Sequence, residues 1–485
     1  MGKSNNQTVV VKNLIWRYAE RCGAQLIQFV VQLILARLLT PAEFGMIGLL
    51  TVFVSLALVF AQSGMGQALV QKKDSDQTDF STVFYFSIVF SVAIYIGLCF
   101  AAPYLAKFYD KPLLVDVIRV LSVMVIIGGV NSVQQAYVQK HMQFKLFFYS
   151  TLSGTIVSAV VGITMAYMGF GIWALVTQQI VNQLVGTIVL FFTVKWRPSM
   201  HFSFKRMGQL FSFGWKMLCS SLLDTLYNNI YSLVIGKRYS DADLGYYNKG
   251  KQFPMLIVQN INTTITSVLF PVLSKVQDEK ERLKSMMRRS IVTSTFLIFP
   301  AMAGLAAIAE PLVKILLTDK WLPAVPFIQF CCFTYAFWPI HTANLQAIKA
   351  LGRSDIFLGL EIAKKIIGIV ILIITLPYGL TVMMIGRCVA TLSSSFINAF
   401  PNRKLLGYSY FEQIKDIFPS MLISIIMVAV ILPVTSLPIH AIWQMCLQII
   451  CGVAVYVGLA KLFKLECFEY ILNTIKNFIS KRKVK

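Results

Sequence analysis

Long apolar runs separated by short polar connections extend along almost the whole chain. An α-helix needs about 20 mostly apolar residues to cross the hydrocarbon core of a bilayer. Backbone groups inside lipid have to be satisfied within the segment itself, which favours helices packed on one another. We therefore predict an all-α polytopic membrane protein with about 14 transmembrane helices, at 14–36, 44–70, 80–108, 113–138, 147–168, 171–194, 210–236, 246–274, 288–318, 323–348, 355–377, 379–400, 415–437 and 440–463.

The composition supports this class. Hydrophobic residues make up 57% of the 485 residues, charged residues 13%, and the mean hydropathy is +0.69. A soluble domain carries roughly 25% charged residues. An integral membrane protein therefore fits the composition, and a soluble enzyme does not.

Three short segments recur in the same order about 200 residues further along the chain. The pairs are ILARLLTPAEFG (34–45) with VIGKRYSDADLG (234–245), YLAKFYDKP (104–112) with PLVKILLTDKW (311–321), and QAYVQKHMQFK (135–145) with QAIKALGRSD (346–355). Such internal repeats are typical of transporters that bind their substrate between two halves. We predict an N-terminal six-helix lobe, a cytoplasmic linker, a second six-helix lobe, and two extra helices with a basic tail, at 1–194, 195–209, 210–402 and 403–485.

The net charge of +23 could indicate a nucleic-acid partner, but its distribution argues against one. Most Lys and Arg residues fall in the connections that the predicted topology places on one side of the membrane. This bias is the positive-inside pattern, and it predicts that both termini are cytoplasmic. The basic C-terminal tail can also contact anionic membrane lipids.

Polar side chains recur on one face of the first helix of each predicted lobe. The first helix carries Arg17, Arg21, Gln25, Gln28 and Gln32 at steps of three or four residues. The first helix of the second lobe carries Lys216, Asp224, Tyr227 and Asn228. Charges at membrane depth are costly and usually face a water-filled or protein interior. The bases on these two helices therefore predict an anion receptor, although Arg17 and Lys216 could instead reach the cytoplasmic headgroups.

Two further helices carry unusual polar residues. Segment 246–274 contains Lys251, Gln259 and Asn262, and Arg387 has no acid near it within 379–400. The amides suit carbohydrate hydroxyls or water, and interhelical hydrogen bonding is the alternative interpretation. Arg387 and Lys251 are further candidates for the anion receptor.

Two acids stand among these bases, Glu20 and Asp224. Either of them could couple transport to a proton or sodium gradient. The alternative interpretation is that they neutralise Arg17, Arg21 or Lys216.

The sequence offers no sign of catalysis or of a cofactor. It has no GxxxxGK[ST] phosphate loop and no HExxH zinc motif, and its nine Cys lack metal-site spacing. No connection is long enough to form a separate catalytic domain. We expect neither a metal nor a cofactor, and no enzyme activity.

The N-terminal run WRYAERCGAQLIQFVVQLILARLLTPAEFGMIGLLTVF, the segment GMGQALVQKKD and the segment YLAKFYDKP resemble a known family. They are similar to the Wzx-type polysaccharide-export flippases, a branch of the multidrug/oligosaccharidyl-lipid/polysaccharide exporter superfamily. The resemblance implies a flippase in the bacterial inner membrane. It implies movement of an undecaprenyl-pyrophosphate-linked oligosaccharide to the outer leaflet, by alternating access of a cationic central cavity. Glycan-assembly enzymes are possible partners.

Within that resemblance, the candidate residues take roles as substrate contacts. The pyrophosphate contacts are Arg17, Arg21, Lys216, Lys251 and Arg387, and the sugar or water contacts are Gln25, Gln28, Gln32, Tyr227, Asn228, Gln259 and Asn262. The competing function is a cation-coupled multidrug extruder on the same scaffold, which would favour acids and aromatic residues in its cavity. Here the bases outnumber the acids. A lipid-linked glycosyltransferase, ligase or polymerase would be expected to carry a sizeable external loop with catalytic acids.

Overall fold

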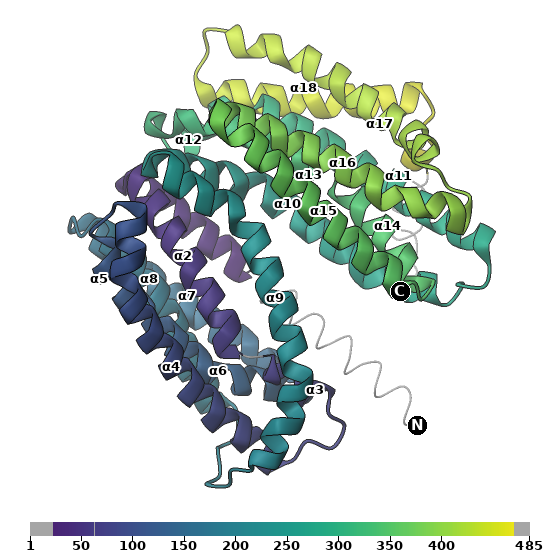
Figure 1. Ribbon diagram of the computed structural model, residues 1–485. Coiled ribbons are helices and arrows are strands. Elements are labelled where there is room, and N and C mark those ends of the chain that lie inside the picture. Colours follow the sequence, from purple (N-terminus) through teal and green to yellow (C-terminus); the bar gives the residue numbers. More distant parts are fainter. Residues whose placement is uncertain (1–22, 63, 470–485) are drawn as a thin grey trace, which may run out of the picture. The chain divides into compact units, whose positions relative to one another are not determined.

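A computed structural model of the chain describes residues 23–62 and 64–469 (Figure 1). All regular secondary structure in this part is helical, and it contains no β-strand. The prediction of an all-α membrane protein is confirmed. The helices form two compact units, of which unit 1 extends to Asn248 and unit 2 begins at Lys249, inside one long helix. The lobe boundaries at 194 and 210 stay a prediction.

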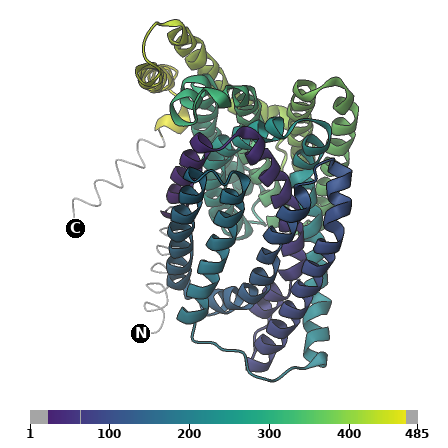
Figure 2. The ribbon, with the colours of Figure 1, turned by 90° about the vertical axis from the view of Figure 1, so that its left-hand side faces the viewer.

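Unit 1 is a bundle of long helices that run side by side (Figures 1 and 2). They are the N-terminal helix Gly23–Leu38, α2 (Pro41–Gln62), α3 (Met65–Gln71), α4 (Gln77–Tyr109), α5 (Leu114–Leu121), α6 (Val123–Lys140), α7 (Phe144–Tyr167), α8 (Ile172–Thr193), α9 (Phe204–Arg238) and the first turns of α10 (Asp241–Ser274).

Unit 2 contains the rest of α10 and a second set of helices. These are α11 (Lys280–Ala307), α12 (Ala309–Leu316), η1 (Asp319–Ala324), α13 (Val325–Ala336), α14 (Trp338–Ala350), α15 (Ser354–Thr375), η2 (Leu376–Tyr378), α16 (Leu380–Leu406), α17 (Tyr410–Ile431), η3 (Leu432–Ser436) and α18 (Ala441–Leu462). The last two long helices pack together, and α17 also packs against α11.

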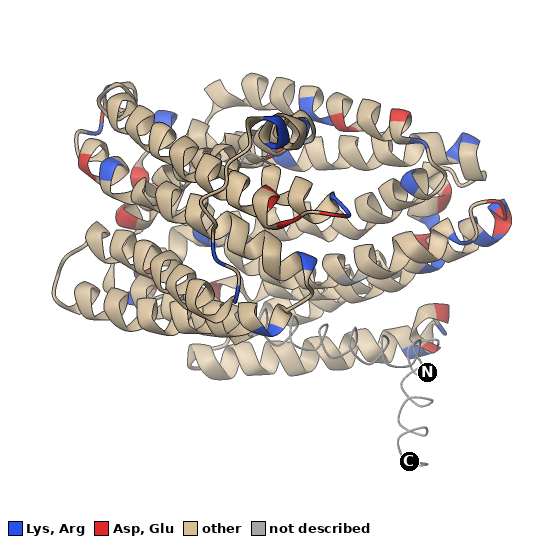
Figure 3. Cartoon of the chain, turned by 90° about the horizontal axis from the view of Figure 1, so that it is seen from below, with Lys and Arg blue, Asp and Glu red and all other residues tan. Residues whose placement is uncertain are grey.

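Eleven helical segments in the described residues are long and apolar enough to cross a membrane. Helix 23–38 is shorter, and α9 and α15 carry charged residues within their length. The number of 14 crossings therefore stays a prediction. Long stretches of the helices carry no charged residue at all, as Figure 3 shows.

The repeat predicted from the sequence is present in the structure. At the start of α2, the Thr40 backbone N–H and hydroxyl donate to Glu43 at 2.7 and 2.8 Å. At the start of α10, the backbone N–H and hydroxyl of Ser240 donate to Asp243 at 3.2 and 2.6 Å. In both turns the N–H of the acid donates back to the hydroxyl. Each helix thus begins with the same capping box, which satisfies backbone donors that no helical turn can reach.

The turn after α6 and the turn after α14 also match. Met142 and Gly352 have positive φ angles of 53° and 72°. The next backbone N–H groups, of Gln143 and Arg353, donate back to the carbonyls of Val138 and Ile348 at 3.0 and 3.2 Å. This pattern ends a helix by satisfying its last carbonyls. A second repeated segment is therefore confirmed at the level of hydrogen bonds.

Three connections predicted to share one side of the membrane meet at one end of unit 1. Lys140, at the end of α6, donates to the carbonyl of Lys72 at 2.7 Å and contacts Ser75. The segment before α9 contacts the start of α4, where the hydroxyls of Ser199 and Ser81 lie 3.0 Å apart. This geometry agrees with the predicted sidedness of 72–79, 140–146 and 195–209. Which face of the membrane this end occupies stays a prediction.

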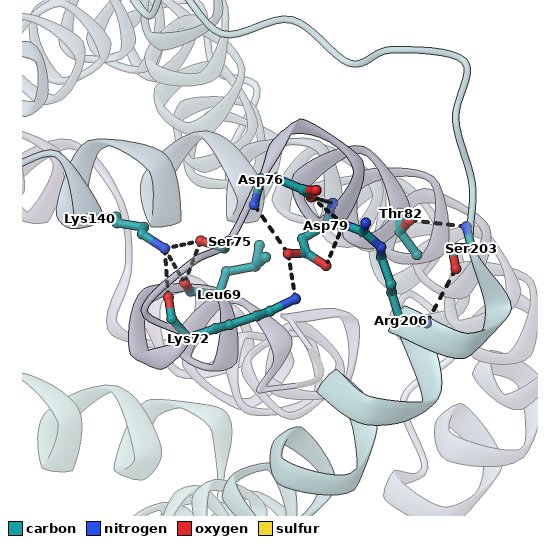
Figure 4. A network of polar contacts seen from close by, with 9 residues as sticks. All are labelled: Leu69, Lys72, Ser75, Asp76, Asp79, Thr82, Lys140, Ser203 and Arg206. Atoms are coloured by element: carbon teal, nitrogen blue, oxygen red, sulfur yellow. Dashed lines mark hydrogen bonds and ion pairs between the residues drawn. The ribbon is translucent and has the colours of Figure 1, made fainter.

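A buried carboxylate organises this end of unit 1 (Figure 4). Asp79 is completely buried, and its oxygens lie 2.6 Å from the Lys72 ammonium and 3.4 Å from the Arg206 guanidinium. Arg206 also pairs with Asp76, whose pKa it holds well below the usual range, at about 2. The network attaches the start of α9 to the α3–α4 turn.

Candidate functional site

Unit 1 contains an open polar cavity of about 570 Å³, which we call the amide chamber. Four of its lining amides come from α8, as Gln178, Gln179, Asn182 and Gln183. Four more come from Gln28 and Gln32 on helix 23–38 and from Asn131 and Gln135 on α6. The hydroxyl groups of Thr51, Ser150, Thr151 and Thr155 complete the polar lining. No Asp, Glu, Lys, Arg or His is among the described lining residues.

Close helix packing forms one wall of the chamber. Gly154 and Gly162 on α7 face α8, and a Cβ added at either would lie within 3 Å of Asn182 or Gln178. Small residues at a helix interface let two backbones approach closely. The glycines thus hold the four amides of α8 in place beside the hydroxyls of α7.

A smaller cavity of about 190 Å³ lies at the α3 end of unit 1. Its lining includes Gln62, Gln67 and Gln139, and α9 contributes Leu218 and Ser221. Gln135 lines both cavities. Because Asn131, Gln135 and Gln139 are spaced by four residues on α6, they form one polar face that connects the two spaces.

The structure places only part of the predicted first-helix face. Gln28 and Gln32 line the amide chamber, while Gln25 lies on the same helix but not in the chamber lining. Arg17, Glu20 and Arg21 lie outside the described residues. On α9, Lys216, Asp224 and Asn228 are exposed and Tyr227 is half-buried. None of these four α9 side chains lines either cavity.

In unit 2 the structure brings two predicted bases together. Lys251 on α10 and Arg387 on α16 are near enough for their like charges to repel each other. Both side chains are half-buried, and the Arg387 guanidinium lies 5.9 Å from the centre of the Tyr335 ring on α13. A tight contact fixes α10 here, since a Cβ on Gly250 would come within 2.5 Å of Phe327. A rigid helix contact therefore positions the basic pair.

The other predicted residues of α10 have different surroundings. Gln259 is exposed. Asn262 accepts a hydrogen bond of 2.5 Å from the hydroxyl of Thr342 on α14, which is the interhelical bonding that the alternative interpretation expected. Lys364 on α15 pairs with Glu361 at 2.6 Å, as expected for charges that neutralise each other within one helix.

Sequence reasoning missed several residues of these sites. Lys249 is only 4% exposed, lies over the Trp321 ring at 5.9 Å and donates to Gln252 at 3.2 Å. Lys249 lies two residues before Lys251, so it is not on the helix face that carries Lys251, Gln259 and Asn262. The spacing of polar residues therefore did not identify it. Ser150 and Thr155 were missed because short hydroxyl side chains scarcely alter an apolar run.

A third cavity, of about 740 Å³, is almost wholly apolar. It lies in unit 2 among α10, α11, α17 and α18, and we call it the apolar groove. Phe296, Pro300, Met427, Gly452 and Tyr456 are among its lining residues. Two of its helices, α17 and α18, belong to the C-terminal pair that the sequence repeat does not include.

The first turns of α2 and α10 touch through a reciprocal glycine contact inside unit 1. A Cβ on Gly45 would lie 1.7 Å from the carbonyl oxygen of Asp241, and one on Gly245 would lie 2.0 Å from that of Pro41. Lys111 donates to Asp241 at 2.5 Å beside this contact. The repeated helices thus meet at equivalent residues, which only glycine allows at this distance.

Comparisons with known proteins agree with this architecture. The structure of the lipid II flippase MurJ in an inward closed conformation superposes with a TM-score of 0.76 at 16% identity, over 93% of this chain and 98% of MurJ. The succinoglycan biosynthesis transport protein ExoT of Rhizobium meliloti is 24% identical over 351 residues, which cover 72% of this chain and 71% of ExoT. The lipopolysaccharide biosynthesis protein WzxC of Escherichia coli is 23% identical over 407 residues, covering 82% of this chain and 81% of WzxC.

The fold and the polar sites inside its helix bundles define a multi-pass membrane transport protein. The family model described as “Polysaccharide biosynthesis protein” matches residues 34–326, and the chain belongs to this family. The resemblance seen in the N-terminal run is thereby confirmed. ExoT is named as a transport protein and MurJ as a flippase, in agreement with the prediction of a non-catalytic protein.

Proposed function

We propose that this protein moves an undecaprenyl-pyrophosphate-linked oligosaccharide from the inner to the outer leaflet of the bacterial inner membrane, for assembly of a cell-surface polysaccharide. The observation that carries the proposal is the basic pair Lys251 and Arg387 inside unit 2. Two like charges near each other inside a membrane bundle repel, and an anion bound between them would offset that repulsion. The names of ExoT and WzxC, and the fold shared with MurJ, support a glycan carried on a lipid.

Pyrophosphate is a compact polyanion, and several fixed cations have to replace its water when it crosses the bilayer. Arg is suited to this task because its planar fork binds two phosphate oxygens at once. Arg17, Arg21 and Lys216 are further proposed pyrophosphate contacts, beside Lys251 and Arg387. The proposed sugar or water contacts are Gln25, Gln28, Gln32, Tyr227, Asn228, Gln259 and Asn262.

The apolar groove of unit 2 suits the lipid part of this substrate. Its lining is aliphatic and aromatic apart from a few polar atoms, and its volume of about 740 Å³ gives an isoprenoid chain extensive apolar contact. In this assignment, one end of the substrate is held by charge and the other by apolar surface. The two interactions are independent and can be tested separately.

We further propose alternating access as the mechanism, with both termini cytoplasmic. The glycine contact between α2 and α10 closes one end of unit 1, and under the proposed orientation that end is external. Separation of the two helices there, with closure at the cytoplasmic end, would expose the site to the outside. Glu20 or Asp224 couples this change to a proton or sodium gradient.

The competing multidrug extruder would need carboxylates to bind cations. The amide chamber has none among its described lining residues, and the basic pair of unit 2 would repel a cationic drug. The geometry therefore favours an anionic, glycosylated substrate.

The direct test is reconstitution of the full-length chain in proteoliposomes with a fluorescent polyprenyl-pyrophosphate-linked saccharide. We expect protein-dependent movement between leaflets at least about tenfold faster than for the matched lipid with a single phosphate, since one charge-assisted contact corresponds to a factor of this order. Equal rates for the two lipids would contradict a pyrophosphate receptor.

The matching test in cells concerns Arg21. Complementation of a flippase-deficient strain should fail with Arg21→Ala at equal membrane abundance, and Arg21→Lys should restore it only partly, because Lys lacks the bidentate fork. A wild-type amount of surface polysaccharide in the Arg21→Ala strain would show that Arg21 is not part of the receptor.

The test of ion coupling uses the same proteoliposomes with an imposed proton or sodium gradient. If transport by Asp224→Asn depends on the gradient as fully as in the wild type, Asp224 is not the coupling residue.

A further inference from the structure

We propose that the amide chamber of unit 1 is a binding subsite for uncharged sugar residues of the transported glycan. This inference rests on the proposed function and adds residues of α6, α7 and α8 to it. The chamber offers eight side-chain amides and four hydroxyl groups, without a charged group among its described lining residues. Amides both donate and accept hydrogen bonds, as sugar hydroxyls do, so the two match in chemistry.

The size of the chamber fits a ligand larger than water or an ion. At about 30 Å³ per water molecule, its 570 Å³ corresponds to roughly 20 waters. This volume falls within the range of small-molecule sites in proteins. A single structural water or a dehydrated cation would leave most of the space unfilled.

The chamber amides differ from a second amide cluster, in unit 2. There, Asn344 and Gln413 exchange hydrogen bonds of 2.8 and 3.0 Å, and Asn402 donates to Asn344 at 2.7 Å. All three side chains are buried, and Asn344 and Gln413 satisfy each other, while the Oδ1 atom of Asn402 has no partner among the described residues. Buried amides that satisfy each other in this way have a structural role, because they connect helices and leave little capacity for a ligand.

In the amide chamber, Gln183 donates to the backbone carbonyl of Met124 at 2.9 Å, but other amides of the described lining lack such a bond. Gln178 is only 6% exposed, and neither it nor Gln135 has a side-chain hydrogen bond to another described residue. The Oδ1 atom of Asn131 is buried without a partner. The chamber hydroxyls, by contrast, donate to helix backbone, as Ser150 does to the carbonyl of Gly186 at 2.7 Å. Water can satisfy the Gln135 and Gln178 amides while the chamber is empty, and the hydroxyl groups of a sugar can replace that water.

The path from the smaller cavity to the chamber is also polar. Gln139, Gln135 and Asn131 succeed one another along α6, and Gln135 lines both spaces. A glycan several sugars long therefore finds amides along its length. A site for a single sugar would not need this extension.

No charged residue is among the described lining residues, and this separates the subsite from the basic pair of unit 2. Removal of chamber amides should weaken binding of the glycan and leave binding of the pyrophosphate unchanged. The effect should grow with the number of sugars on the lipid. This dependence on glycan length is a readout that a merely structural role of the amides would not produce.

The test uses full-length protein in proteoliposomes and two fluorescent lipids, polyprenyl pyrophosphate with one neutral sugar and with four. In the double variant Gln135→Met/Gln178→Met, the rate for four sugars relative to one should fall about tenfold, as the loss of two hydrogen bonds predicts. Gln413→Met serves as the control for removal of a structural amide, and its rate ratio should match that of the wild type. Equal losses for both lipids, or no loss, would overturn the subsite.

A second measurement keeps the inference independent of the flipping assay. Soluble neutral oligosaccharides of two to six glucose units, α-linked or β-linked, should raise the unfolding temperature of the wild-type protein in detergent and not that of the double variant. If the wild type flips neither lipid but shows this difference, the proposed function fails and the subsite stands. No stabilisation by any of these sugars, together with an unchanged rate ratio, would overturn the subsite alone.

Discussion

The amide chamber of unit 1 and the basic pair of unit 2 each take one residue from two repeated helices that begin alike and then diverge. Helices α2 and α10 start with the same capping box, Thr40 with Glu43 and Ser240 with Asp243. Eleven residues after each cap, α2 has Thr51, which lines a chamber with no charge among its described lining residues, whereas α10 has Lys251 near a second base. The two copies of the repeat thus share the turn that begins the helix but differ in the charge of the side chain eleven residues later.

The difference shows which positions the architecture constrains. A capping box and a glycine contact are needed wherever two helices begin side by side, because unpaired backbone donors and a clashing Cβ are costly in any membrane protein. A side chain that lines a cavity is not under these packing constraints, so its charge can be chosen to suit the ligand. In the proposed functions of these two sites, the basic pair recognises the charged part of the substrate and the amide chamber an uncharged part.

The largest effect is expected from Lys251→Thr, which gives α10 the residue that α2 carries. It removes a charge-assisted contact worth about 1.5–3 kcal/mol, and we expect transport to fall by at least about tenfold whatever the glycan length. The double variant Lys251→Thr/Arg387→Ala, present in the membrane at the same abundance as the wild type, should give no detectable surface polysaccharide in the complementation test.

Arg353→Ala is the matched control. Arg353 is an exposed base that pairs with Asp355 at 2.7 Å, and a surface pair of this kind contributes little. Transport should stay close to that of the wild type. A loss in Lys251→Thr that depends on glycan length, as expected for the chamber variants, would contradict separate roles for the basic pair and the amide chamber.

An intermediate effect is expected where the repeated helices share their structure. In Gly45→Ala the new Cβ would collide with the carbonyl oxygen of Asp241, and overpacking costs about 1–3 kcal/mol. The contact between α2 and α10 should open, which lowers transport about tenfold by shifting the population of the closed state. A cysteine at the buried position Leu244, in a chain free of other cysteines, should then label faster with an impermeant thiol reagent.

Gly97→Ala is the control for this prediction, since no atom lies within 4 Å of a Cβ at that position. It should leave labelling and transport unchanged. Unchanged labelling of Leu244→Cys in the Gly45→Ala background would show that the glycine contact does not control access.

Much of the fold could be predicted from the sequence because membrane helices leave a direct signal. Long apolar runs gave the helices, and the TPAEFG and SDADLG segments gave the repeat, since a capping box is a local feature that needs its residues at fixed spacing. The distribution of Lys and Arg predicted that the connections meeting around Lys140 lie on the same side of the membrane.

The site could be predicted only in part, because burial and pairing depend on neighbours from distant helices. Periodicity placed Gln28 and Gln32 on one face, and both line the chamber. Periodicity also made Asn262 a candidate sugar contact. Its side-chain oxygen, however, accepts a hydrogen bond from the hydroxyl of Thr342, eighty residues away in the sequence. Lys249 is not on the polar face of α10 and is buried against Trp321. The sequence of α10 alone does not reveal this contact, because Trp321 lies in η1.

The smallest effect is expected at the ionic network around Asp79, because none of its charged residues lines either cavity of unit 1. Asp76 pairs with Arg206, which lowers its pKa from the ordinary value to about 2. A carboxylate with a depressed pKa stabilises the folded state above its unfolded pKa of about 3.9, and this contribution is lost as the pH falls towards 2. Asp76→Asn should therefore lower the unfolding temperature slightly at pH 6 and have no effect near pH 2. The ratio of transport rates for four sugars and one should not change, because the network attaches α9 to the α3–α4 turn and lines neither cavity. An altered ratio in Asp76→Asn would mean that this end of unit 1 takes part in glycan recognition, and the neutral chamber would then no longer account for it alone.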